Sequence, residues 1–212
     1  MKKRLHDKKA GIAILISLII ISLAEVIFRA VAVGEAILTT SNLGEQLAVI
    51  ALAVTILVLT AKGKDRACYI CYGAWIGYFV FDHIFELPGQ FISALSSLSK
   101  SAMLSNGGVI DSIGVIVHVL TYVGIIVIGI LLVEYMNDGS IYNRAFNISC
   151  AITLALLVLS VAISVYNVCM GMPLELMLLA FNNLYRLTMV FLCTFFAYDS
   201  AKMQLKKTDL TK

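Results

Sequence analysis

Six long apolar stretches follow one another along the chain, separated by short polar segments. A helix needs about 20 mostly apolar residues to cross a bilayer, and the stretches lack the alternating pattern of an outer-membrane barrel. The pattern therefore predicts an all-α polytopic membrane bundle with six transmembrane helices, in which residues 1–212 form a single transmembrane domain. The predicted spans are Gly11–Val33, Gly44–Ala61, Ala67–Leu87, Val109–Val133, Ala145–Cys169 and Leu174–Tyr198.

The longest interruption between spans, Pro88–Gly108, has a helical pattern of its own. Phe91, Leu95 and Leu98 recur at helical spacing, with serines and a lysine on the opposite side. Such a segment is typical of an amphipathic helix that lies on the membrane surface. We expect this helix at about residues 90–104, on the outer face.

Composition agrees with a membrane protein. Hydrophobic residues make up 60% of the chain and charged residues 14%, with a mean hydropathy of +0.95. A soluble domain is about half apolar and a quarter charged, and disordered chains are poor in hydrophobic residues. A soluble domain and a disordered chain are therefore excluded, and we expect the protein to lie in the lipid bilayer.

The basic residues predict the orientation. Most of the 16 lysines and arginines flank the first span, the loop between spans two and three, the start of span five and the end of span six. Cytoplasmic flanks hold such residues preferentially. We therefore expect a multi-pass protein of the cell membrane with both termini in the cytoplasm. The basic N-terminus and Ala30–Ala32 also resemble a signal peptide, but Glu25 and Arg29 are atypical of a cleavage region, and we interpret the segment as a span.

Polar residues within the spans are the candidates for function, because intramembrane ionisable residues are costly and usually line pathways or sites. At about 1.5 Å per residue, they lie in the outer half of the membrane or near its midplane. This placement predicts an outward-facing polar cavity. The candidate ligand-binding residues are Glu25, Arg29, Asp82, Glu86, His118, Asn182, Asn183 and Arg186.

Further acidic residues lie at the same outer boundary, against a single lysine, Lys100. If all were ionised, the mouth of the cavity would be negative and would attract cations. These boundary residues are Glu35, Glu45, Asp111 and Glu175.

Spacing indicates which of the charged residues meet. Glu25 and Arg29 are four residues apart, which allows an ion pair on one helix face. Asp82 and Glu86 also share a face. Arg186 has no carboxylate in its own span, and Glu25 is the candidate at matching depth.

The leading hypothesis is a membrane protein that binds a small polar solute or a cation from the outer side and takes part in its transport with other membrane subunits. In size, number of crossings and expected cavity, the chain is similar to the substrate-capturing subunits of energy-coupling uptake systems, although no shared motif carries this similarity. No nucleic-acid partner is expected, because the basic residues form membrane-flanking patches.

Two alternatives remain open. In the first, the protein is a sensory, assembly or immunity subunit without a solute, and the polar residues form an interhelical clamp. In the second, it is a metal-dependent intramembrane enzyme with Asp82, His83, Glu86 and His118 as metal ligands. The sequence contains no recognised catalytic motif, so we assign no catalytic residue and predict no cofactor.

Small residues indicate close helix contacts. Gly73 and Gly77 form a GxxxG element in the third span, a pattern that mediates either packing within a bundle or docking to another subunit.

Overall fold

The computed structural model describes residues 2–33, 41–101, 108–138, 143–171 and 176–209, and over these residues the chain is helical throughout apart from short turns. The predicted all-α membrane bundle is confirmed. Glu35 and Glu175 lie outside the described residues, as do the side chains of Lys100 and Asp111. The elements are α1 (Lys2–Phe28), its π-helical continuation η1 (Arg29–Val33), α2 (Ser41–Ala61), α3 (Asp65–Ser101), α4 (Gly108–Asp138), α5 (Arg144–Cys169) and α6 (Leu176–Asp209).

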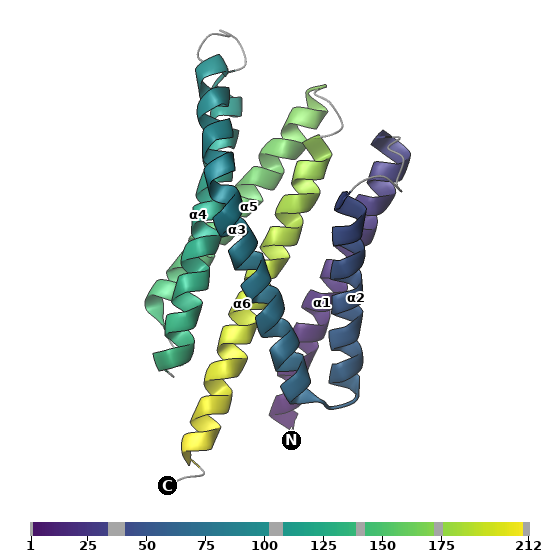
Figure 1. Cartoon of the computed structure of the whole chain (residues 1–212), viewed down its shortest axis with the longest axis vertical. Coiled ribbons are helices and arrows are strands. Elements are labelled where there is room, and N and C mark those ends of the chain that lie inside the picture. The colour runs from purple at the N-terminus through teal and green to yellow at the C-terminus, as the bar shows by residue number, and fades with distance from the viewer. Residues whose placement is uncertain (1, 34–40, 102–107, 139–142, 172–175, 210–212) are drawn as a thin grey trace.

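Five helices contain segments long and apolar enough to cross a membrane. The remaining helix, α3, also runs along the bundle (Figure 1) but is less apolar, because tyrosines, Trp75, Asp82 and His83 interrupt its hydrophobic residues. Large apolar side chains such as Ile20 and Ile130 are exposed on the outside of the bundle, as expected for a surface that faces lipid. The apolar segments are Lys9–Val31, Gly44–Ala61, Ser112–Met136, Arg144–Cys169 and Leu176–Ser200.

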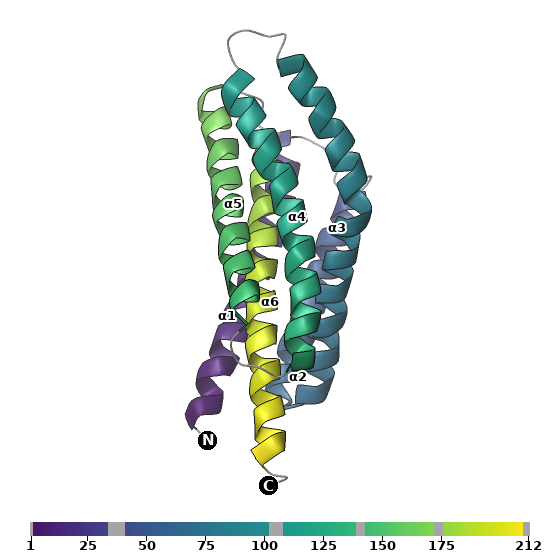
Figure 2. The ribbon, with the colours of Figure 1, turned by 90° about the vertical axis from the view of Figure 1, so that its left-hand side faces the viewer.

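Helix α6 holds the bundle together. It packs against α1 on one side and against α4 and α5 on the other, while α1 pairs with α2 and α3 pairs with α4. Figures 1 and 2 show α6 between these groups, with the two chain ends at the same end of the bundle. This arrangement agrees with an even number of crossings.

A tight turn joins α2 to α3. Gly63 adopts a positive φ of 68°, and the backbone N–H groups of Gly63 and Lys64 donate to the carbonyls of Thr60 and Leu59. This is the Schellman arrangement, which ends a helix at a left-handed glycine. From this turn α3 leans away from α2 and toward α4 (Figure 1), so the two helices diverge.

The prediction of a separate surface helix at residues 90–104 is wrong, because this segment is part of a longer helix. Helix α3 continues through Pro88 as far as Ser101, and residues 102–104 lie outside the described part of the chain. Proline removes one backbone hydrogen-bond donor, and Pro88 therefore suggested a helix end. In membranes, however, packing against a neighbouring helix allows a helix to continue through a proline. Here α4 pairs with α3, and Ala94 is buried beyond the proline.

Glycines permit close contacts at two places along α4. A Cβ atom added to Gly124 would overlap Thr153 of α5, and one added to Gly129 would overlap Val80 of α3. In the predicted GxxxG element, by contrast, a Cβ on Gly73 would only touch Phe196, and one on Gly77 would meet nothing within 4 Å. Internal packing therefore depends on the α4 glycines, and Gly77 is not a contact point within the bundle.

Candidate functional site

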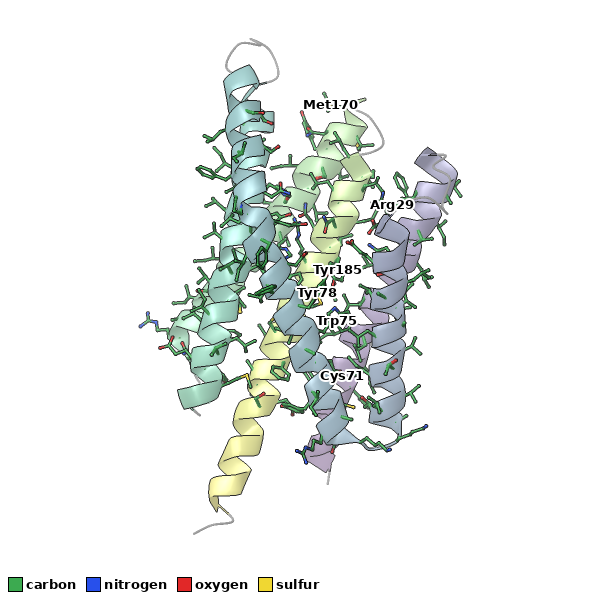
Figure 3. All side chains as sticks on the ribbon, viewed as in Figure 1. Arg29, Cys71, Trp75, Tyr78, Met170 and Tyr185 are labelled. Atoms are coloured by element: carbon green, nitrogen blue, oxygen red, sulfur yellow. The ribbon has the colours of Figure 1, made fainter. Side chains whose placement is uncertain are left out.

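A cavity of about 600 Å³ lies between α2, α3 and α6, and Tyr122 of α4 contributes to its wall. We call it the first cavity. Helix α3 lines it with residues spaced three or four apart, which places them on one helix face. Figure 3 shows Cys71, Trp75 and Tyr78 in succession along α3, with Tyr185 of α6 beside them.

The first cavity has a polar end and an apolar end. Helices α2 and α3 are antiparallel, so Glu45 at the start of α2 lies level with the later part of α3, where Asp82 and Glu86 lie. Leu52 and Ile70 line the opposite end. The cavity therefore extends from the polar residues well into the apolar part of the bundle, farther than the polar residues alone predicted.

Carboxylates dominate the polar end. Glu86 Oε2 accepts a hydrogen bond of 2.8 Å from the Tyr122 hydroxyl. Within the described part of the chain, the carboxylates of Glu45 and Asp82 form no hydrogen bond or ion pair. Gln46, Gln90 and Asn182 add neutral polar groups to this end. The polar end thus carries more acceptor than donor capacity.

Arg186 is the cation of the first cavity, and only 3% of it is exposed. Its Nη2 donates to the Tyr122 hydroxyl, its Nη1 lies 3.5 Å from Asn183 Oδ1, and its Cζ lies 4.3 Å from the centre of the Tyr122 ring. No partner is found for its Nε within the described residues. The guanidinium is therefore held by neutral groups, and its Nε–H is left without a partner among the described residues.

The predicted contact between Arg186 and Glu25 is wrong. Glu25 Oε1 accepts from Arg29 Nε and Nη2 at 3.1 and 2.9 Å, and its Oε2 accepts from Gln46 Nε2 at 2.9 Å. The predicted pair of Glu25 and Arg29 is thus present. Glu25 contacts α2, whereas Arg186 contacts α4.

The structure accordingly separates Glu25 and Arg29 from the first cavity. Neither lines it, and Figure 3 places Arg29 near the end of α1, away from Tyr185 and Tyr78. Glu25 is 4% exposed, and its bond to Gln46 joins α1 to α2. This pair therefore forms an interhelical clamp, which is linked to the first cavity through Gln46.

His83 contributes a buried acceptor to the first cavity. Its Nδ1 lies 2.8 Å from the carbonyl oxygen of Phe79, which can only accept a hydrogen bond. The proton of a neutral His83 ring must then reside on Nδ1, and Nε2 carries a lone pair. Nε2 has no partner within the described residues, and His83 is 4% exposed.

His118 lines a second cavity, of about 230 Å³, between α3, α4, α5 and α6. The centroid of the Tyr122 ring lies 4.8 Å from that of His83 and 5.2 Å from that of His118. Asn183 is also turned away from the first cavity, because its Nδ2 donates to Ser160 Oγ of α5 at 2.7 Å. His118 and Asn183 are therefore not brought into one site with Asp82.

The four residues anticipated as metal ligands do not converge. Asp82, His83 and Glu86 line the first cavity, whereas His118 lines the second. Across the described ranges, no group of three or more histidine, cysteine, aspartate or glutamate side chains is placed to hold a metal ion. The geometry gives the metal-dependent enzyme no support.

Several residues of the first cavity escaped the sequence analysis, because only ionisable residues and asparagines were considered there. Trp75 donates through Nε1 to the Tyr185 hydroxyl at 3.4 Å, and Tyr122 joins Arg186 to Glu86. A sequence signal for part of this wall exists in α3, where Trp75, Tyr78 and Asp82 recur at helical spacing. Nothing in the sequence distinguishes Tyr122 from other tyrosines.

Comparisons with known proteins give no match: no protein-family model, no curated protein and no solved structure is similar to the chain. Function is therefore inferred from the chemistry and geometry of the first cavity.

Proposed function

We propose that the protein binds a small polar solute or a cation in the first cavity from the outer side of the membrane. The supporting observation is the set of unsatisfied groups at the polar end. The carboxylates of Glu45 and Asp82 and the Nε of Arg186 lack partners among the described residues. Charged groups at membrane depth are costly without compensation, and a bound solute would supply it.

We further propose that binding serves transport, with other membrane subunits. The sequence has no phosphate-binding loop of the kind that couples ATP hydrolysis to movement. A chain of this kind would depend on a partner for energy. The clamp of Glu25 and Arg29 would hold α1 and α2 in place beside the cavity.

Ligand-dependent thermal unfolding of the purified protein in detergent tests the binding proposal. The panel contains amino acids, diamines, quaternary ammonium ions and inorganic cations. A ligand at 100 times its Kd stabilises a protein by about 2.7 kcal/mol, which raises the melting temperature measurably. We expect at least one compound class to stabilise the wild type, and Asp82→Asn, Glu45→Gln and Arg186→Gln to reduce that response.

Glu134→Gln is the matched control, because Glu134 is an exposed carboxylate on α4 and does not line the first cavity. Its ligand response should equal that of the wild type. Asp82→Asn and Glu45→Gln keep the test valid if Arg186→Gln fails to fold, because neither residue is buried. Equal stabilisation of the wild type and the cavity variants, or none in the wild type, would overturn the proposal.

A second candidate is a sensory, assembly or immunity subunit without a solute. The observation in its favour is that Glu25, Arg29 and Asn183 are engaged in contacts within and between helices. Purification with a stoichiometric partner protein, together with no ligand response in the unfolding assay, would favour this role over solute binding.

A further inference from the structure

The first cavity is long. Its lining residues on α3 extend from Ile70 to Gln90, a distance of about 30 Å at the rise of an α-helix. Its volume is about 600 Å³. A compact hydrophilic solute would occupy only part of this space.

The inner part of the first cavity is apolar. Val49, Leu52, Ile70 and Ala74 line it together with the buried ring of Trp75. Water held among such residues has few hydrogen-bond partners, whereas an apolar group gains from burial there. The apolar end therefore favours a hydrocarbon portion of the ligand.

The first cavity is also open along its side. Ile70 and Tyr78 line it and are each 65% exposed. They lie on α3, which diverges from α2 (Figure 1), and the surrounding exposed residues are apolar. The opening along this seam is thus at the depth of the lipid chains, which gives a membrane-dissolved molecule a route of entry.

The polar end favours a positively charged group. It presents the carboxylates of Glu45, Asp82 and Glu86 and the lone pair of His83 Nε2, all of which accept hydrogen bonds. Its one cation, Arg186, is already held by Tyr122 and Asn183. Aromatic rings in the same wall, including Tyr78, attract cations through their faces.

We infer that the first cavity takes an amphipathic cation, with a protonated amine at the carboxylates of the polar end and an apolar tail along Trp75 in the inner part. This inference rests on the proposed function and names its ligand class. The three N–H donors of an ammonium group match the carboxylate acceptors of the polar end, while the tail contacts the apolar residues of the inner part.

Trp75 provides a built-in probe, because it is the one tryptophan of the chain and it lines the first cavity. Its fluorescence is measured during titration of the protein in lipid nanodiscs with primary alkylammonium ions of increasing chain length. Methylammonium represents the head group alone. Alkyl alcohols and alkyl sulfates of equal length are the neutral and anionic counterparts, and a Trp75→Phe variant corrects for background.

We expect affinity to rise by roughly fourfold for each added methylene, the value for full burial of that group. Ammonium compounds should bind at least tenfold more tightly than alcohols and sulfates of the same length. Asp82→Asn should remove this preference for charge and keep the dependence on chain length. Ala74→Phe, which fills the apolar part, should weaken long chains and leave methylammonium unchanged.

Ala155→Phe places the same ring on an exposed position of α5 and should behave as the wild type. Equal responses in all variants would mean partition into the lipid and would overturn the inference. Binding of methylammonium as tight as that of long chains, or a preference for alcohols or sulfates, would also overturn it, while leaving solute binding intact. A complete lack of binding here and in the unfolding panel would overturn the proposed function as well.

Discussion

Arg186 and Tyr122 contact each other in two ways, through a hydrogen bond from Nη2 to the tyrosine hydroxyl and through the guanidinium carbon, 4.3 Å from the ring centre. The same hydroxyl donates to Glu86 at 2.8 Å. A neutral tyrosine thus lies between a buried cation and a carboxylate. Both charged groups depend on a single oxygen atom.

Replacement of that oxygen is the most direct test of the contact. Tyr122→Phe keeps the ring over the guanidinium but leaves Arg186 Nη2 and Glu86 Oε2 without their partner. We expect a loss of about 1–3 kcal/mol in unfolding free energy, the usual effect of an unsatisfied buried polar group. Thermal or denaturant unfolding in detergent measures it. Tyr166→Phe, at an exposed tyrosine of α5, should change stability by less than about 0.5 kcal/mol; equal effects of the two would contradict this assignment.

The clamp on α1 should respond asymmetrically to mutation. Arg29→Gln leaves the carboxylate of Glu25 buried without its cation, whereas Glu25→Gln leaves Arg29, whose side chain is 18% exposed, able to reach water. Removal of one partner of a buried ion pair costs about 3–5 kcal/mol, mostly because of the charge left behind.

We therefore expect Arg29→Gln to lower the melting temperature more than Glu25→Gln does. The double variant should be more stable than Arg29→Gln alone, as a double-mutant cycle would reveal. The reverse order for the two single variants would mean that Arg29, rather than Glu25, is the residue that depends on the pair.

Close packing of α3 on α4 predicts a suppressor pair. Gly129→Ala should destabilise the protein by about 1–3 kcal/mol, the range for overpacking, because the added methyl group would overlap Val80. Val80→Ala in the same chain should restore part of the loss. Gly77→Ala is the matched control, since its methyl group meets nothing within 4 Å, and it should be neutral or stabilising by up to about 1 kcal/mol. Unfolding midpoints of Gly129→Ala, of the double variant and of Gly77→Ala decide the outcome.

Orientation is tested at the α2–α3 turn, where Lys64 is exposed. In a Cys169→Ser background, which removes the exposed native thiol, Lys64→Cys should react with a membrane-impermeant thiol reagent only in inside-out vesicles. This result follows if the basic turn is cytoplasmic. Labelling in intact cells would place the polar end of the first cavity toward the cytoplasm and would reverse the proposed direction of solute entry.

The sequence predicted the helices well because each apolar stretch has the length and period of a membrane helix. The predicted helix end at Pro88 was wrong, because α3 packs against α4 and continues through the proline, which usually ends a helix. Among the polar residues, the hydrogen-bonded pair Glu25 and Arg29 and the shared face of Asp82 and Glu86 could be predicted, because each pair lies on one helix with its members four residues apart.

Contacts between helices could not be read from the sequence, because they depend on how each helix is rotated about its own axis. Arg186 illustrates this limit, because its partner on another helix is Tyr122 and not Glu25. Asn182 and Asn183 are neighbours in sequence, yet one lines the first cavity and the other bonds to Ser160. Adjacent positions on a helix are about 100° apart, so a single step decides which neighbour a side chain meets.

The Tyr122 ring is near one histidine of each cavity. Its centroid lies 4.8 Å from that of His83, which lines the first cavity, and 5.2 Å from that of His118, which lines the second. A ligand that draws Glu86 or Arg186 away from the tyrosine hydroxyl removes a restraint on the ring, and the ring in turn borders His118. A change in the contacts of this one hydroxyl therefore alters the surroundings of a histidine in each cavity.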